Sequence, residues 1–127
     1  MSLGAYLEPP IIKTAGGTQL LDILEAGSLI VAAGAAATSF RLPPVTSPEQ
    51  DARFTFLNTV GQNMAILAPS TAGYVGAPTS ILTFNNLAAA SLTFSTANQL
   101  IGACATARTI NGRWHVINSS QNTATIA

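Results

Sequence analysis

The dipeptide Asn111-Gly112 separates two runs of apolar and β-branched residues, and this arrangement predicts a β-hairpin. The tight turn of such a hairpin needs positive φ at both central residues, which Asn and Gly adopt most readily. On the strand after the turn, Trp114 and Val116 share one face and His115 lies on the other. The hairpin indicates an all-β chain, and none of its residues forms a catalytic motif.

Short apolar runs separated by turn-forming residues continue this pattern upstream. Many short strands with regular turn signals are typical of a β-sandwich or barrel. We expect a jelly-roll-like β-sandwich that forms a single domain over residues 19–127, since domains most often have about 100–150 residues. The strands are expected over residues 20–24, 28–32, 38–42, 53–58, 64–68, 80–84, 90–95, 100–107 and 113–118.

The structural core of this sandwich is expected to use large apolar side chains from alternating strand positions. These residues are Phe54, Phe56, Phe84, Phe94, Trp114 and Val116. Two segments leave alternatives open. Residues 20–25 also fit the apolar stripe of a helix, and residues 47–51 fit one helical turn with Ser47 as its N-cap.

Residues 1–18 are expected to form an extended N-terminal arm outside the sandwich. Pro9-Pro10 holds the backbone extended, and Gly16-Gly17 provides a flexible joint. The alternative is a disordered tail. An extended arm with apolar side chains is expected to lie along another protein surface, and its contacting residues are Leu3, Tyr6, Leu7, Pro9, Pro10, Ile11 and Ile12.

Charge is scarce in this chain. Charged residues make up 8% of the sequence, against about 25% in an average soluble domain, and the formal net charge is zero. A chain with so little charge is expected to be a subunit that covers much of its surface with copies of itself or with a larger body, and we expect a homotrimer. No Lys or Arg cluster is interleaved with aromatic residues, so we expect no direct nucleic-acid binding.

The first residues lack the basic start and apolar core of a secretory signal. The longest apolar run, residues 29–37, is too short to cross a bilayer. The single cysteine, Cys104, cannot form an internal disulfide and is expected to be a buried thiol. We therefore expect synthesis in a reducing cytoplasm and no membrane partner.

The residue types in the sequence give little support for a catalytic, metal or cofactor site. The five acidic residues form no recognisable catalytic motif, and the single histidine, His115, is not accompanied by a Gly-x-Ser-x-Gly elbow. One Cys and one His cannot make a zinc site within one chain, and no phosphate-binding loop is present. The sequence predicts a protein that is not an enzyme and holds neither metal nor cofactor.

Four segments carry a resemblance to a known group of proteins. A strand that ends in Leu42-Pro43 is followed by the Phe-x-Phe strand 53–58, by Leu92-Thr93-Phe94 and then by the closing Asn-Gly-x-Trp-x-Val hairpin. This order is similar to small structural domains of tailed bacteriophages, namely the β-sandwich decoration (cement) proteins of phage heads and the related head-fibre and tail-fibre modules. The resemblance covers most of residues 19–120.

The resemblance implies a trimer that binds the outer capsid surface and bridges neighbouring major capsid proteins. It also implies a location on the capsid surface of the virion, after assembly in the host cytoplasm. The alternative is a phage fibre or receptor-binding module that binds carbohydrate through Trp114, Tyr74, Asn85 and Asn86. For Trp114 itself, a place in the core is favoured, because it shares a face with Val116 beside a long apolar strand.

Overall fold

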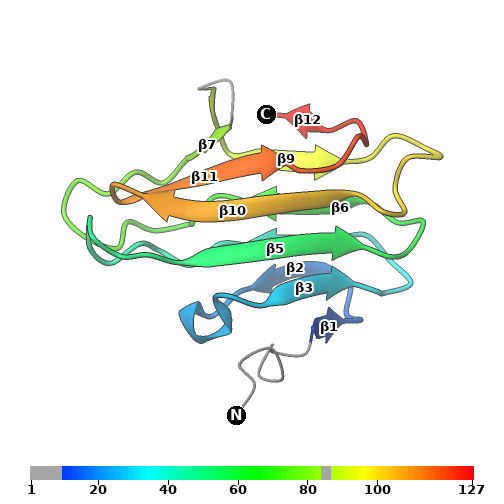
Figure 1. Ribbon diagram of the computed structural model, residues 1–127, viewed down its shortest axis with the longest axis horizontal. Coiled ribbons are helices and arrows are strands. Elements are labelled where there is room, and N and C mark those ends of the chain that lie inside the picture. Colours follow the sequence, from blue (N-terminus) through cyan, green and yellow to red (C-terminus); the bar gives the residue numbers. More distant parts are fainter. Residues whose placement is uncertain (1–9, 84–86) are drawn as a thin grey trace, which may run out of the picture.

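Two β-sheets make up the computed structural model of this chain, which describes residues 10–83 and 87–127. Figure 1 shows the larger sheet in front of the fainter strands of the smaller one. The larger sheet has the order β1 (Ile11–Lys13), β3 (Leu29–Ala32), β5 (Arg53–Asn58), β10 (Cys104–Ile110), β11 (Arg113–Asn118), β7 (Ile81–Thr83) and β8 (Ala88–Ala89). The smaller sheet has the order β12 (Thr125–Ile126), β9 (Ser91–Phe94), β6 (Met64–Leu67), β4 (Thr38–Arg41) and β2 (Gly17–Leu20).

The first six described strands alternate between the two sheets. Strands β1, β3 and β5 lie side by side and parallel in the larger sheet, and β2, β4 and β6 do the same in the smaller one. The chain then reverses, because β9 runs antiparallel to β6 and β10 antiparallel to β5. The all-β prediction is confirmed, but the jelly-roll order is not, since a jelly roll is an antiparallel architecture.

The core lies between the two sheets. Phe40 of β4 and Phe56 of β5 stack across it with ring centroids 5.5 Å apart, and Phe54 packs on Trp114 at 5.8 Å. Alternating strand positions bring these side chains to the inner faces and send their neighbours outward. Of the residues expected in the core, Phe84 lies outside the described residues, and the buried ones are Phe54, Phe56, Phe94, Trp114 and Val116.

The predicted hairpin is confirmed. Ile110 of β10 is opposite Arg113 of β11, and the two residues between them, Asn111 and Gly112, have φ of 53° and 79°. Positive φ at both positions is the signature of the type I′ turn that Asn-Gly favours.

The N-terminal region differs from the expected arm. Ile11–Lys13 pairs with β3, and Gly17–Leu20 pairs with β4, so the expected boundary after residue 18 falls inside β2. An edge strand is held by main-chain hydrogen bonds, which need no repeated apolar pattern and therefore left no sequence signal. Of the expected arm contacts, Ile11 packs on the core of its own chain, while Pro10 and Ile12 are exposed. Leu3, Tyr6, Leu7 and Pro9 lie outside the described residues.

Other differences concern short elements. The segment 20–25 contains the 3-10 helix η2 (Ile23–Glu25) in place of a strand, and residues 47–50 form a turn closed by a hydrogen bond from the Gln50 N–H to the Ser47 carbonyl. Strand β10 begins at Cys104, because the preceding residues turn at Gly102, whose φ is 87°. The strands β8 and β12 contain two residues each, which is too short for a period-two pattern.

Candidate functional site

The outward-facing side of the larger sheet, here called the outer face, carries three rows of side chains that run across its strands. Within each row, neighbouring residues are register partners on adjacent strands. The apolar row is Ile12, Val31, Leu57 and Cys104; the threonine row is Leu29, Thr55, Thr106 and Ile117; the basic row is Arg53, Arg108 and His115.

The apolar and threonine rows form a surface without charge. Ile12 at one end is 62% exposed and Ile117 at the other is 47% exposed, while Val31 between them is buried. The remaining members of both rows are half-buried. An uncharged face that exposes large apolar side chains is a common mark of a protein–protein contact.

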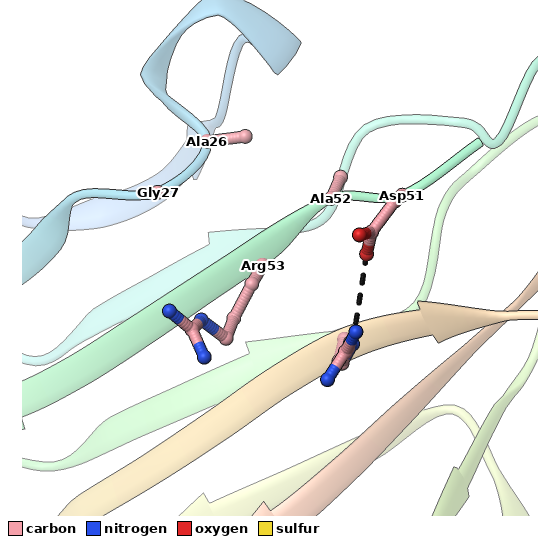
Figure 2. A pocket seen from close by; sticks show the side chains of 6 residues that line it. Ala26, Gly27, Asp51, Ala52 and Arg53 are labelled. Atoms are coloured by element: carbon pink, nitrogen blue, oxygen red, sulfur yellow. Dashed lines mark ion pairs between the residues drawn. The ribbon is translucent and has the colours of Figure 1, made fainter.

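The basic row borders this uncharged surface. Arg53 of β5 and Arg108 of β10 are direct register partners, so two guanidinium groups project from adjacent strands to the same side. Both line a pocket of about 330 Å³, shown in Figure 2, whose other lining residues are Ala26, Gly27, Asp51 and Ala52.

Asp51 is the acidic residue of this pocket. Its Oδ1 lies 3.5 Å from Arg108 Nε, and the Arg108 and Asp51 side chains are 54% and 74% exposed. A pair this long and this exposed contributes little to stability. Within the described part of the chain, no hydrogen bond or ion pair engages the guanidinium group of Arg53. The pocket therefore contains two cationic groups and one carboxylate.

One wall of the pocket is held by the segment between η2 and β3. Asp22 caps η2 by accepting a hydrogen bond from the Leu24 N–H, and the Glu25 carboxylate accepts one from the Asp22 N–H. The other Glu25 oxygen lies 3.0 Å from Lys13 Nζ of β1. Burial raises the pKa of Glu25, but these hydrogen bonds and the lysine charge outweigh it, so the pKa lies below its usual value.

The opposite wall is held by Thr109. Its buried hydroxyl accepts a hydrogen bond from the Ala52 N–H and donates one to the Gln50 carbonyl, both at 2.8 Å. Gly27 joins the two walls, because its N–H donates to the Arg53 carbonyl and its φ of +90° suits glycine best. Hydrogen bonds therefore hold the backbone in place on both sides of the pocket.

The described residues of the outer face form no metal cluster and no hydrogen-bonded catalytic pair. In residues 10–83 and 87–127, no group of three or more His, Cys, Asp or Glu side chains lies together as a metal site would need. No hydrogen bond between described residues joins His115 to a serine or a carboxylate. No described helix is long and apolar enough to cross a membrane.

One expectation about a single residue needs correction. Cys104, expected to be buried, is half-buried in the apolar row, and its Sγ accepts a hydrogen bond from Ser119 Oγ. Trp114 is 1% exposed and lies in the core, the place favoured for it from the sequence, so the alternative in which a sugar stacks on it is not open to it. Tyr74 packs on the core and donates to the Gly112 carbonyl, while Asn85 and Asn86 lie outside the described residues.

The Arg53–Arg108 pair was missed by the sequence analysis. The two residues are far apart in the chain, and only the antiparallel pairing of β5 with β10 brings them together. Comparison of this chain with protein families, with curated proteins and with solved structures finds no match.

Proposed function

We propose that this chain is a virion structural protein, a decoration protein that binds the outer capsid surface of a tailed phage. The observation that carries the proposal is the uncharged surface of the apolar and threonine rows, with Ile12 and Ile117 exposed at its ends. The resemblance of the strand and hairpin motifs to phage decoration proteins supplies the capsid as the partner. The protein needs no turnover to perform this task.

The physical basis of the proposed function is the burial of apolar area. Each square ångström of apolar surface removed from water contributes roughly 25 cal/mol. A protein that binds only the assembled capsid stabilises that state by mass action, by about 2.7 kcal/mol per site when its free concentration is 100 times Kd. When many copies bind one capsid, these contributions add up and raise the free energy needed to open the capsid.

The proposal includes a homotrimer that bridges neighbouring major capsid proteins. The exposed apolar residues are spread over more than one side of the sandwich, with Leu20 on the edge strand β2 and Leu24 on η2 in addition to the outer face. A subunit that contacts both the capsid and its own copies would cover more than one such surface. The fibre or receptor-binding alternative is weaker, because Trp114 is not available for stacking.

The test uses particles of the encoding phage that were assembled without this chain. Purified protein is added, the particles are pelleted, and bound copies are counted and located by cryo-electron microscopy. The proposal predicts saturable binding at regular capsid positions. If the protein fails to bind particles that carry no other decoration protein, the proposal is wrong.

Matched variants identify the contacting surface. Ile12→Asp and Ile117→Asp place a charge on the outer face, and each is expected to weaken particle binding at least about tenfold, because a buried unpaired charge is costly. Ile101→Asp is the control, since Ile101 is 68% exposed but lies in the turn before β10. All three variants are compared only after thermal unfolding confirms that they fold. Equal binding of the three would show that the outer face is not the contact.

A further inference from the structure

We propose that the pocket between Arg53 and Arg108 is a carboxylate-binding site that receives an Asp or Glu side chain of the partner protein. This inference rests on the proposed function for the identity of the partner, but the anion site itself can be tested without the partner. The pocket lies beside the uncharged rows, so an apolar contact and an ionic contact would belong to one continuous interface.

Arg53 and Arg108 are register partners that carry like charges. Like charges directly opposite each other on adjacent strands destabilise a sheet. Arg53 and Arg108 occupy such positions, and Asp51, the carboxylate among the described residues that line the pocket, pairs with Arg108 at 3.5 Å and not with Arg53. Placing an anion between the two guanidinium groups would remove this repulsion, and a guanidinium is well suited to bind a carboxylate through two parallel hydrogen bonds.

The charge and the volume of the pocket suit one carboxylate side chain. Two arginines and Asp51 leave a formal charge of +1, which a single carboxylate neutralises. The remaining lining residues, Ala26, Gly27 and Ala52, are small, and a Cβ placed on Gly27 would meet no atom within 4 Å. The volume of about 330 Å³ therefore has room for a side chain that enters from outside.

The guanidinium groups of the other two arginines already donate hydrogen bonds within the chain. Arg41 Nη1 donates to the Ala68 carbonyl at 2.7 Å, and Arg113 Nη2 donates to Ser80 Oγ at 2.6 Å. The Nε of Arg113 has no hydrogen-bond partner among the described residues, but it is buried and therefore not accessible to an anion from solvent. Arg53 and Arg108 thus differ from the rest in presenting exposed guanidinium groups to a shared pocket.

The anion site is tested by titrating the full-length ¹⁵N-labelled protein with sodium acetate at constant ionic strength. The Nε–Hε resonances of Arg53 and Arg108 are expected to shift along one saturable curve, while that of Arg113 stays in place. Arg53→Gln and Arg108→Gln should each weaken acetate binding at least about tenfold, because each removes a charged donor. Inorganic phosphate is titrated in parallel. Phosphate binding without acetate binding would overturn the assignment, and so would shifts that grow linearly at all arginines.

Asp51→Asn gives a test in the opposite direction. Removal of the carboxylate that competes for Arg108 should tighten acetate binding by about threefold or more, because an opposing charge is gone from the pocket. Glu49→Gln is the matched control, since it changes net charge equally at an exposed residue that does not line the pocket, and it should leave acetate binding unchanged. Equal gains from the two variants would indicate a general effect of net charge and would overturn the site.

The partner step is tested on the particles described above. Arg53→Gln and Arg108→Gln should each reduce particle binding at least about fivefold, and Glu49→Gln should not. If wild-type protein binds particles and the two arginine variants bind equally well, the pocket does not receive a partner carboxylate, although the decoration function stands. If the acetate site is present but wild-type protein binds no particles, the proposed function fails and the partner assignment fails with it.

Discussion

The indole Nε1–H of Trp114 donates a hydrogen bond of 2.8 Å to the carbonyl oxygen of Pro43. Trp114 belongs to β11 of the larger sheet, and Pro43 follows β4 of the smaller one, so this bond joins the two layers through the core. Both the tryptophan and its partner are buried, which makes the bond costly to remove.

Trp114→Phe should therefore lower the free energy of unfolding by about 2–4 kcal/mol, since it leaves the Pro43 carbonyl unpaired and opens a cavity. Urea unfolding followed by circular dichroism measures the change. Tyr74→Phe serves as a control, because it removes only a 3.3 Å hydrogen bond to Gly112 and should lower stability by about 1 kcal/mol or less. Similar losses in the two variants would contradict the importance of the Trp114 bond.

Thr109→Val keeps the shape of the side chain but removes the hydroxyl that accepts from the Ala52 N–H. We expect it to lower the free energy of unfolding by about 1–3 kcal/mol, because a buried donor loses its partner. Thr109→Ser retains the hydroxyl and should be affected less. Denaturant unfolding of both variants tests this, and a valine variant as stable as the serine variant would be evidence against it.

The Glu25 contacts predict a dependence of stability on pH. The pKa of Glu25 lies below its ordinary value of 4.5 in the folded protein, so its charged form stabilises the fold. This contribution is complete above the unfolded pKa and is lost as the pH falls through the folded pKa. The stability difference between wild type and Glu25→Gln should be constant near neutral pH and shrink below about pH 4.5. A difference that grows on acidification would show the opposite sign.

Arg53→Gln is expected to raise stability slightly or leave it unchanged at low salt. It removes a repulsion between register partners on β5 and β10, a term of up to about 1 kcal/mol. The gain should disappear at about 1 M salt, where the Debye length is near 3 Å. Thermal unfolding at both salt concentrations measures it. A clear loss of stability would mean that Arg53 stabilises the fold. In that case no bound anion is needed to explain why an arginine occupies this position.

A homotrimer is expected in solution at micromolar concentration, because charged residues make up only 8% of the chain and large apolar residues remain exposed. Sedimentation equilibrium gives the mass directly. A monomer of 13.0 kDa that shows no association over this range would contradict the trimer.

Local structure was predictable from the sequence, whereas pairing between distant strands was not. The Asn111-Gly112 hairpin is confirmed because a two-residue turn is decided by the φ preferences of its own residues. The parallel neighbours β1, β3 and β5 could not be foreseen, since period-two patterns identify strands without identifying partners. The pocket was missed for the same reason, because it exists only where β5 meets β10.

The loops after β5 and β11 share a pattern of side-chain hydrogen bonds that was not predicted from the sequence. Asn58 accepts from the Val60 N–H and donates to the Gln62 carbonyl, and Asn118 accepts from the Ser120 N–H and donates to the Asn122 carbonyl. Each strand thus ends in an asparagine that organises the next four residues through its side chain. The period-two pattern places each asparagine at the end of a strand, but it does not predict the hydrogen bonds that its side chain makes to the loop.

The alternation of successive strands between the two sheets has a consequence for how the chain must fold. Because β1 to β6 enter the sheets in turn, no contiguous stretch of these residues can assemble either layer by itself. Most strand partners are separated by an intervening strand of the opposite layer, so pairing must wait for loops to close across the core, at an entropic cost. Both layers should therefore form together in one slow, cooperative step, and fragments cut between β4 and β5 should remain unfolded until they are mixed.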